Sequence, residues 1–126
     1  REDKYGGKTP EETYGMFLEA LRKGDTELAS KYFVVGKQED WLKTLEEFKN
    51  NGSLADFIIE LENTQKIWKK SDKSDENAVS FIYSNIIKGE KIVEFEGQKL
   101  TIPAGNYQNE TMLVKYLSGV WKIELL

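Results

Sequence analysis

The spacing of apolar residues changes once along this chain, and that change limits the folds it can adopt. Up to about residue 64 the apolar residues recur every three or four positions, and after it they alternate. These two periods belong to amphipathic helices and to strands with one buried face. A chain with helices first and strands afterwards is typical of an α+β domain rather than a βαβ unit. We expect N-terminal helices packed on an antiparallel β-sheet.

The first residues predict a leader followed by a well-marked helix start. Residues 1–8, REDKYGGK, are polar and contain paired glycines, which favours a flexible leader or linker. Thr9 suits the N-cap position, Pro10 the first helical turn and Glu12 the capping box. Gly24 suits the end of this helix. Residues 9–126 are then long enough for one domain with a single core.

Three more helices are predicted before the strands begin. Asp25 is placed to cap a short helix that reaches Phe33, and a β-type interruption follows over residues 33–36. A third helix is expected from about Gln38 to Asn51, and a fourth begins after a cap made by Ser53 and Asp56.

The remaining segments predict an antiparallel meander. Residues 65–71 predict a first strand, and the polar residues 71–77 predict the loop after it. Residues 77–88 alternate, so that one face carries Val79, Phe81, Tyr83 and Ile87, and the other carries Ser80, Ile82, Ser84 and Ile86.

Two hairpins complete the predicted sheet. A turn at Gly97–Gln98 would pair Phe95 with Leu100, Val93 with Ile102 and Glu96 with Lys99. A turn at Ser118–Gly119 would pair Tyr116 with Trp121, Val114 with Ile123 and Met112 with Leu125. In that register the apolar residues of the second hairpin share the core face.

Composition excludes several kinds of chemistry. The 126 residues include no cysteine and no histidine, which removes thiolates, the commonest general base and the commonest transition-metal ligand. The net charge is −4 without a basic stripe, so we expect no nucleic-acid partner. No apolar run is long enough to span a bilayer. The chain starts at Arg1, so membrane attachment would need an unseen N-terminal anchor.

Both ends of the chain resemble one superfamily. The opening has the pattern TPEE..Y..FLEAL.KGD.ELA.KYF, and the closing strand has the pattern YL.GVWKIELL. Together they are similar to the cystatin-like α+β superfamily and, within it, to small bacterial domains of the nuclear-transport-factor-2-like kind that are exported or lipid-anchored. The residues that carry the resemblance are Pro10, Phe17, Leu21, Gly24, Asp25, Ala29, Tyr32 and Phe33, with Gly119, Val120, Trp121, Lys122 and Ile123.

The resemblance covers residues 9–126 and implies a curved sheet wrapped around a long helix, often with a conical pocket. Members of the superfamily include isomerases, dehydratases, partner-binding modules and dimerisation domains, so the fold does not decide the function. Dehydratase-like members use a histidine–aspartate pair that this chain lacks. No position matches the aspartate and tyrosines of the isomerase type.

Five residues are predicted to lie near a pocket between the first helix and the sheet: Tyr14, Tyr83, Asn85, Tyr116 and Trp121. Asn85 shares a face with Phe81 and Tyr83, and a polar group there needs a partner. The alternative is that Asn85 lies near the turn at Lys88–Gly89 and is solvated. The aromatic residues are also compatible with ordinary core. The acidic loop at 72–77 lacks the pattern of a calcium site, so no metal or cofactor is predicted.

These observations favour a non-catalytic, extracytoplasmic domain that binds an unidentified small molecule or protein. Export is what the resemblance implies, and cytoplasmic residence is also compatible with the sequence. One alternative is a small-molecule enzyme or carrier that uses the predicted pocket. Another is self-association, as a homodimer, through the outer sheet face that carries Ile82 and Ile86.

Overall fold

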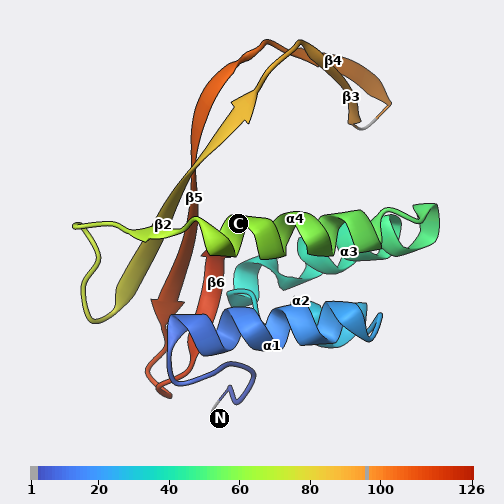
Figure 1. Ribbon diagram of the computed structural model, residues 1–126. Helices are drawn as coiled ribbons and strands as arrows, with labels where there is room; N and C mark the ends of the chain where they lie inside the picture. Colours follow the sequence, from blue (N-terminus) through green and yellow to red (C-terminus); the bar gives the residue numbers. More distant parts are fainter. Residues whose placement is uncertain (1–2, 96) are drawn as a thin grey trace.

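The computed structural model describes residues 3–95 and 97–126 and has the predicted α+β class (Figure 1). The helical part comprises α1 (Pro10–Arg22), α2 (Thr26–Ser30), the 3₁₀ turn η1 (Val35–Lys37), α3 (Gln38–Asn51) and α4 (Leu54–Lys66). The strands are β1 (Lys69–Lys70), β2 (Ala78–Ile87), β3 (Lys91–Phe95), β4 (Gln98–Ile102), β5 (Gly105–Lys115) and β6 (Trp121–Leu125).

The strands form two separate antiparallel sheets. The larger has the order β1-β2-β5-β6, and β3 pairs with β4 alone. Strands β2 and β5 pair along their whole length, from Ala78↔Val114 to Ile87↔Gly105. Figure 1 shows this ribbon leaving the helices and the β3–β4 hairpin curving back above α4. The hairpin is therefore an arm that projects from the packed body.

Local signals determine where the first helices begin. The Thr9 hydroxyl accepts a hydrogen bond from the Glu12 backbone N–H at 3.0 Å, and the Asp25 carboxylate accepts one from the Leu28 N–H at 3.0 Å. Both predicted N-caps are confirmed. Helix α2 ends at Ser30 and so is shorter than predicted. Phe33 instead makes a parallel bridge with Ile123 of β6.

Helix α4 continues further than the change in period indicated. It ends at Lys66, so the strand predicted at residues 65–71 is reduced to the two residues of β1. The N–H groups of Ile67 and Trp68 still donate to carbonyls of the last helical turn. The Trp68 ring stacks on Phe81, with centroids 4.1 Å apart, which fixes the helix end against β2. Ser53 occupies the N-cap position, but its hydroxyl bonds Asn51 rather than the helix.

The predicted register of the last hairpin is wrong in two of its three pairs. Tyr116 closes a loop by donating its N–H to the Val120 carbonyl at 2.8 Å, and Gly119 in that loop has φ +95°. Strand β6 therefore pairs one residue out of the predicted register: Lys115↔Trp121, Val114↔Lys122 and Leu113↔Ile123.

A bulge between Met112 and Leu113 then restores the predicted pair Met112↔Leu125. The one-residue turn difference and the bulge compensate each other, because a bulge adds one residue to one of the two paired strands. Trp121 is buried. On β5, however, the buried core residues are Leu113 and Thr111, so the face of this strand that points to the core is not the one that the predicted register requires.

The β3–β4 hairpin is also paired differently from the prediction. Val93 lies opposite Leu100 and Phe95 opposite Gln98, which is a two-residue shift. A shift by two keeps every residue on its predicted face. Gly97 has φ +77°, as tight hairpin turns require. The predicted partner of Lys99, Glu96, lies outside the described residues, and Lys99 pairs with Glu94.

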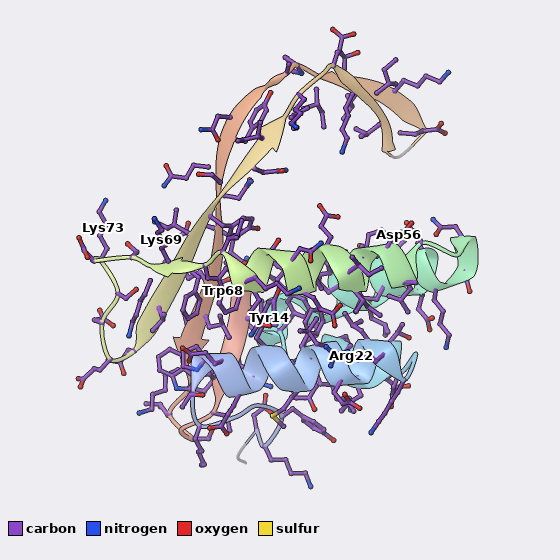
Figure 2. All side chains as sticks on the ribbon, viewed as in Figure 1. Tyr14, Arg22, Asp56, Trp68, Lys69 and Lys73 are labelled. Atoms are coloured by element: carbon purple, nitrogen blue, oxygen red, sulfur yellow. The ribbon has the colours of Figure 1, made fainter. Side chains whose placement is uncertain are left out.

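Aromatic side chains fill the space between α1 and the sheet. The α1 stripe of Tyr14, Phe17 and Leu21 is fully buried. The Phe17 ring lies edge-on to Phe33, with centroids 5.2 Å apart. Figure 2 shows Tyr14 and Trp68 between α1 and α4, and their ring centroids are 4.5 Å apart. Full burial of such side chains stabilises the fold by about 2 kcal/mol each.

Residues 3–8, where the sequence predicts a leader, make specific contacts with the domain. The Gly7 N–H donates to the Thr13 hydroxyl at 2.9 Å, and the Gly7 carbonyl accepts from the Trp121 N–H at 3.0 Å. A Cβ added at Gly7 would lie 2.4 Å from the Glu12 Cβ, so only glycine fits this close approach.

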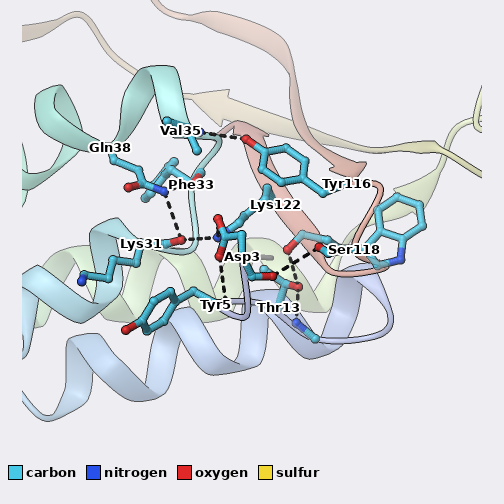
Figure 3. A network of polar contacts seen from close by, with 12 residues as sticks. Asp3, Tyr5, Thr13, Lys31, Phe33, Val35, Gln38, Tyr116, Ser118 and Lys122 are labelled. Carbon is cyan, nitrogen blue, oxygen red and sulfur yellow. Dashed lines mark hydrogen bonds and ion pairs between the residues drawn. The ribbon is translucent and has the colours of Figure 1, made fainter. Parts of the chain in front are cut away.

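A buried lysine anchors the same segment to β6 (Figure 3). The side chain of Lys122 is fully buried, and its ammonium donates to the Lys31 carbonyl at 2.6 Å and contacts the Asp3 carboxylate at 2.8 Å. The rings of Tyr5 and Tyr116 lie 5.9 Å from the ammonium. Hydrogen bonds, an ion pair and aromatic faces thus surround the buried charge.

Candidate functional site

A groove of about 590 Å³ runs between α4 and the β2–β5 ribbon. Its helix side is lined by Asp56, Ile59, Glu60, Asn63, Thr64 and Ile67, and its strand side by Tyr83, Ser84, Asn85 and Asn109. Trp41, Phe57, Leu61 and Leu126 complete the lining. The groove begins where the ribbon leaves the helices, so its position follows from the length of β2 and β5.

Helix α4 has apolar residues on two sides, and this explains its place at the groove. Leu61 is buried against the core, whereas Ile59 and Ile67 are 53% and 52% exposed. Ile59 lies within α4, Ile67 directly follows its last residue, Lys66, and both side chains line the groove. Asp56 and Glu60 line the groove one turn apart (Figure 2 labels Asp56). The helix thus offers an apolar strip with carboxylates beside it.

The strand side of the groove is polar and aromatic. Tyr83 lies opposite Asn109 across the β2–β5 pair. Burial decreases along this face of β2, from Val79 and Phe81 in the core to the exposed Asn85. The side-chain amides of Asn85 and Asn109 can each donate and accept hydrogen bonds. This wall can therefore bind the polar backbone of a polypeptide or a polar small molecule.

Tyr14 supports the groove from inside the protein. Its hydroxyl donates to the carbonyl of Leu61 at 3.0 Å, on the helix that forms the groove. Burial raises the pKa of the Tyr14 phenol above its ordinary value, and the neighbouring Tyr83 phenol raises that pKa further. Tyr14 is fully buried, so it positions the groove wall rather than contacting a ligand.

The other two predicted site residues lie elsewhere. Trp121 is buried, with its backbone carbonyl accepting from the Thr13 hydroxyl at 2.9 Å. The Tyr116 hydroxyl accepts from the Val35 N–H at 2.8 Å, close to Lys122 (Figure 3). Of the five candidates, Tyr83 and Asn85 line the groove and Tyr14 bonds its wall from the core, whereas Tyr116 and Trp121 do not line it.

Sequence reasoning missed the helix side of the groove. The helical spacing of Leu54, Phe57, Ile58 and Leu61 gives α4 one apolar stripe toward the core, but this stripe does not include Ile59. An isoleucine outside the apolar stripe was the available signal. Asn109 carried no comparable signal, because its contact with the groove depends on how far β5 extends.

A second hollow, of about 510 Å³, lies on the outer face of the sheet. Its lining includes Ile82 and Met112 together with the charged residues Lys73 and Glu110. Ile82 was one of two residues expected on a self-association surface. The other, Ile86, is more exposed but does not line this hollow.

The main groove has few ionisable lining groups. Its ionisable lining groups, in the described part of the chain, are the two carboxylates of α4 and the Tyr83 phenol. No cluster of three or more acidic side chains suited to a metal ion is found in residues 3–95 and 97–126. Over the same residues, no helix is both long enough and apolar enough to cross a membrane.

Two buried polar atoms make no hydrogen bond within the described residues. They are the indole nitrogen of Trp68 and the hydroxyl of Thr111. Both flank Phe81, because Trp68 stacks on its ring and Thr111 lies opposite it in the β2–β5 pair. Each reduces stability, since a buried polar group without a partner loses its bond to water.

Comparison of the chain with protein-family models, with curated proteins and with solved structures gives no match. The resemblance to nuclear-transport-factor-2-like domains therefore stays a prediction.

Proposed function

We propose that this protein is a non-catalytic binding domain whose binding surface is the groove between α4 and the β2–β5 ribbon. One observation carries the proposal: Ile59 in α4 and Ile67 directly after it are both about half exposed and both line the groove. Exposed apolar side chains rimmed by polar groups often mark interaction sites.

The lining favours a polypeptide segment with apolar and basic side chains. Apolar side chains of a partner would pack on Ile59 and Ile67, and basic groups would meet Asp56 and Glu60. The amides of Asn85 and Asn109 would pair with the backbone of the bound segment.

A catalytic role for the groove has less support. The carboxylates of Asp56 and Glu60 are exposed on the helix surface. A general acid or base in an enzyme more often has a buried carboxylate whose pKa is raised. The extracytoplasmic placement belongs to this proposal as well, and the resemblance alone supports it.

Selection of binders from a random displayed peptide library tests the proposal. The immobilised wild-type protein serves as the target, and the affinity of each enriched peptide is then measured for the wild type and for the Ile59→Glu variant. We expect enriched peptides that combine apolar residues with lysine or arginine and that bind the variant at least about tenfold more weakly. Enrichment of peptides that bind both proteins equally would contradict the proposal, as would a failure to enrich any peptide at a concentration where the protein is monomeric.

A further inference from the structure

The β3–β4 hairpin has little support from the rest of the molecule. Strands β3 and β4 contact each other extensively. Within the described residues, neither strand makes extensive contact with a helix or with the larger sheet. A two-stranded hairpin alone is marginally stable in water. A stable arm of this kind therefore needs another surface to pack against.

The hairpin presents apolar side chains to solvent. Val93 and Leu100 face each other across the strand pair, and Leu100 is 46% exposed. Lys91 and Ile102 form the next pair on the same face. This face, which we call the arm face, comprises Lys91, Val93, Leu100 and Ile102. Ile92, on the opposite face, is 68% exposed.

The exposed surface of the whole chain is larger than that of a typical monomer. The accessible surface is 8512 Å². Folded monomers of 126 residues expose about 6,900 Å² according to the size scaling of globular proteins. The excess of about 1,600 Å² is twice the roughly 800 Å² per partner that a specific interface buries. A dimer that buries the arm and the groove thus has enough surface available.

We propose that the occupant of the groove is a second copy of this chain. In a two-fold symmetric dimer, the arm face of each protomer packs on α4 of its partner. This inference rests on the proposed function of the groove and names the partner. A two-fold axis places the same pair of surfaces in contact twice, so one hairpin–groove contact gives two copies of the interface.

The two surfaces are complementary in apolar character and in charge. The arm face is apolar and carries one positive charge, Lys91. The helix side of the groove exposes Ile59 and Ile67, and its charged lining residues are Asp56 and Glu60. Apolar contacts would supply most of the affinity, and the opposite charges would set the orientation.

Analytical ultracentrifugation over a wide concentration range is the first test. We expect the wild type to dimerise, and Ile59→Glu or Leu100→Glu to raise the dimer dissociation constant at least about tenfold. Leu117→Glu is the matched control, because Leu117 is a fully exposed apolar residue in the β5–β6 turn. This control should dimerise like the wild type. A monomeric wild type, or a dimer unaffected by Ile59→Glu, would overturn the proposal.

Exchange of charges across the interface is the second test. Glu60→Lys alone and Lys91→Glu alone each place like charges together in both copies of the contact, so each should weaken the dimer. An equimolar mixture of the two variants restores opposite charges in both contacts. We expect the mixture to associate more tightly than either variant alone. Equal association of mixture and single variants contradicts the proposal, because a hairpin closing on its own groove or a dimer through Ile82 would not depend on mixing.

The two proposals fail in different ways. If the wild type stays monomeric while library peptides bind in a manner sensitive to Ile59→Glu, the dimer is excluded and the binding groove stands. If neither association nor peptide binding depends on Ile59, the groove is not a binding surface.

Discussion

The ammonium of Lys122 in β6 lies 2.8 Å from the carboxylate of Asp3, at the start of the described chain. This ion pair holds the segment before α1 against the last strand. The lysine is completely buried and the aspartate is partly exposed. Loss of one partner therefore has different consequences depending on which residue is changed.

Asp3→Asn should destabilise the protein more than Lys122→Met. The first change leaves a buried ammonium with the Lys31 carbonyl as its remaining close partner, at a cost of about 2 kcal/mol. The second removes the charge and keeps an apolar stem of similar length, so it should cost less. Urea denaturation measures both. Asp72→Asn, in an exposed loop, is the control and should change stability by less than about 0.5 kcal/mol. A larger loss in Lys122→Met would contradict the prediction.

Stability should also depend on pH through Lys122. Burial lowers the pKa of the Lys122 ammonium below its ordinary value of 10.5, and the hydrogen bond and charge of Asp3 oppose that shift. Between the lowered pKa and 10.5 the unfolded chain binds more protons than the folded one, so stability rises with pH in this window. As pH rises toward 10.5, the unfolding free energy of the wild type should therefore increase relative to that of Lys122→Met. A difference that stays constant with pH would show that the pKa is not lowered.

Thr111→Val should stabilise the fold by about 1 kcal/mol. The Thr111 hydroxyl is buried and makes no hydrogen bond within the described residues, and valine has nearly the same shape with a higher preference for strands. Thr13→Val is the matched control, because the Thr13 hydroxyl accepts from the Gly7 N–H and donates to the Trp121 carbonyl. The control should lose about 2 kcal/mol. Thermal unfolding compares the two, and a destabilised Thr111→Val would mean that the hydroxyl does have a partner.

Features determined by short stretches of sequence could be predicted. The caps at Thr9 and Asp25 depend on residues within one helical turn, and the structure confirms both. The bounds of α3, Gln38–Asn51, agree with the prediction for the same reason, since Gly52 ends the helix with φ +80°.

Features that depend on tertiary contacts could not be predicted in this way. The register of β6 depends on a loop and a bulge that compensate each other, and periodicity alone does not reveal such a pair. The groove depends on α4 lying next to the β2–β5 ribbon, so that Ile59 and Asn85, from distant parts of the sequence, line the same groove. Periodicity placed Tyr83 and Asn85 on one strand face, but it gave no information about the helix facing them.

Hydrogen exchange should show that the amides of the β3–β4 hairpin are protected in the dimer and not in the monomer. Amides of an isolated two-stranded hairpin open easily, because few buried contacts hold the strands. In dilute protein we expect the amides of Lys91–Phe95 and Gln98–Ile102 to exchange much faster than those of β6, which pairs with β5 and packs on the core. At concentrations where the wild type dimerises, exchange of its hairpin amides should become slower. In Leu117→Glu the exchange should slow to the same extent, and in Ile59→Glu it should not slow. Mass spectrometry of peptic fragments resolves the two regions.

Slow hairpin exchange in the dilute wild type and in dilute Ile59→Glu would show that the arm is stable without a partner. This result would remove the physical reason for expecting a dimer.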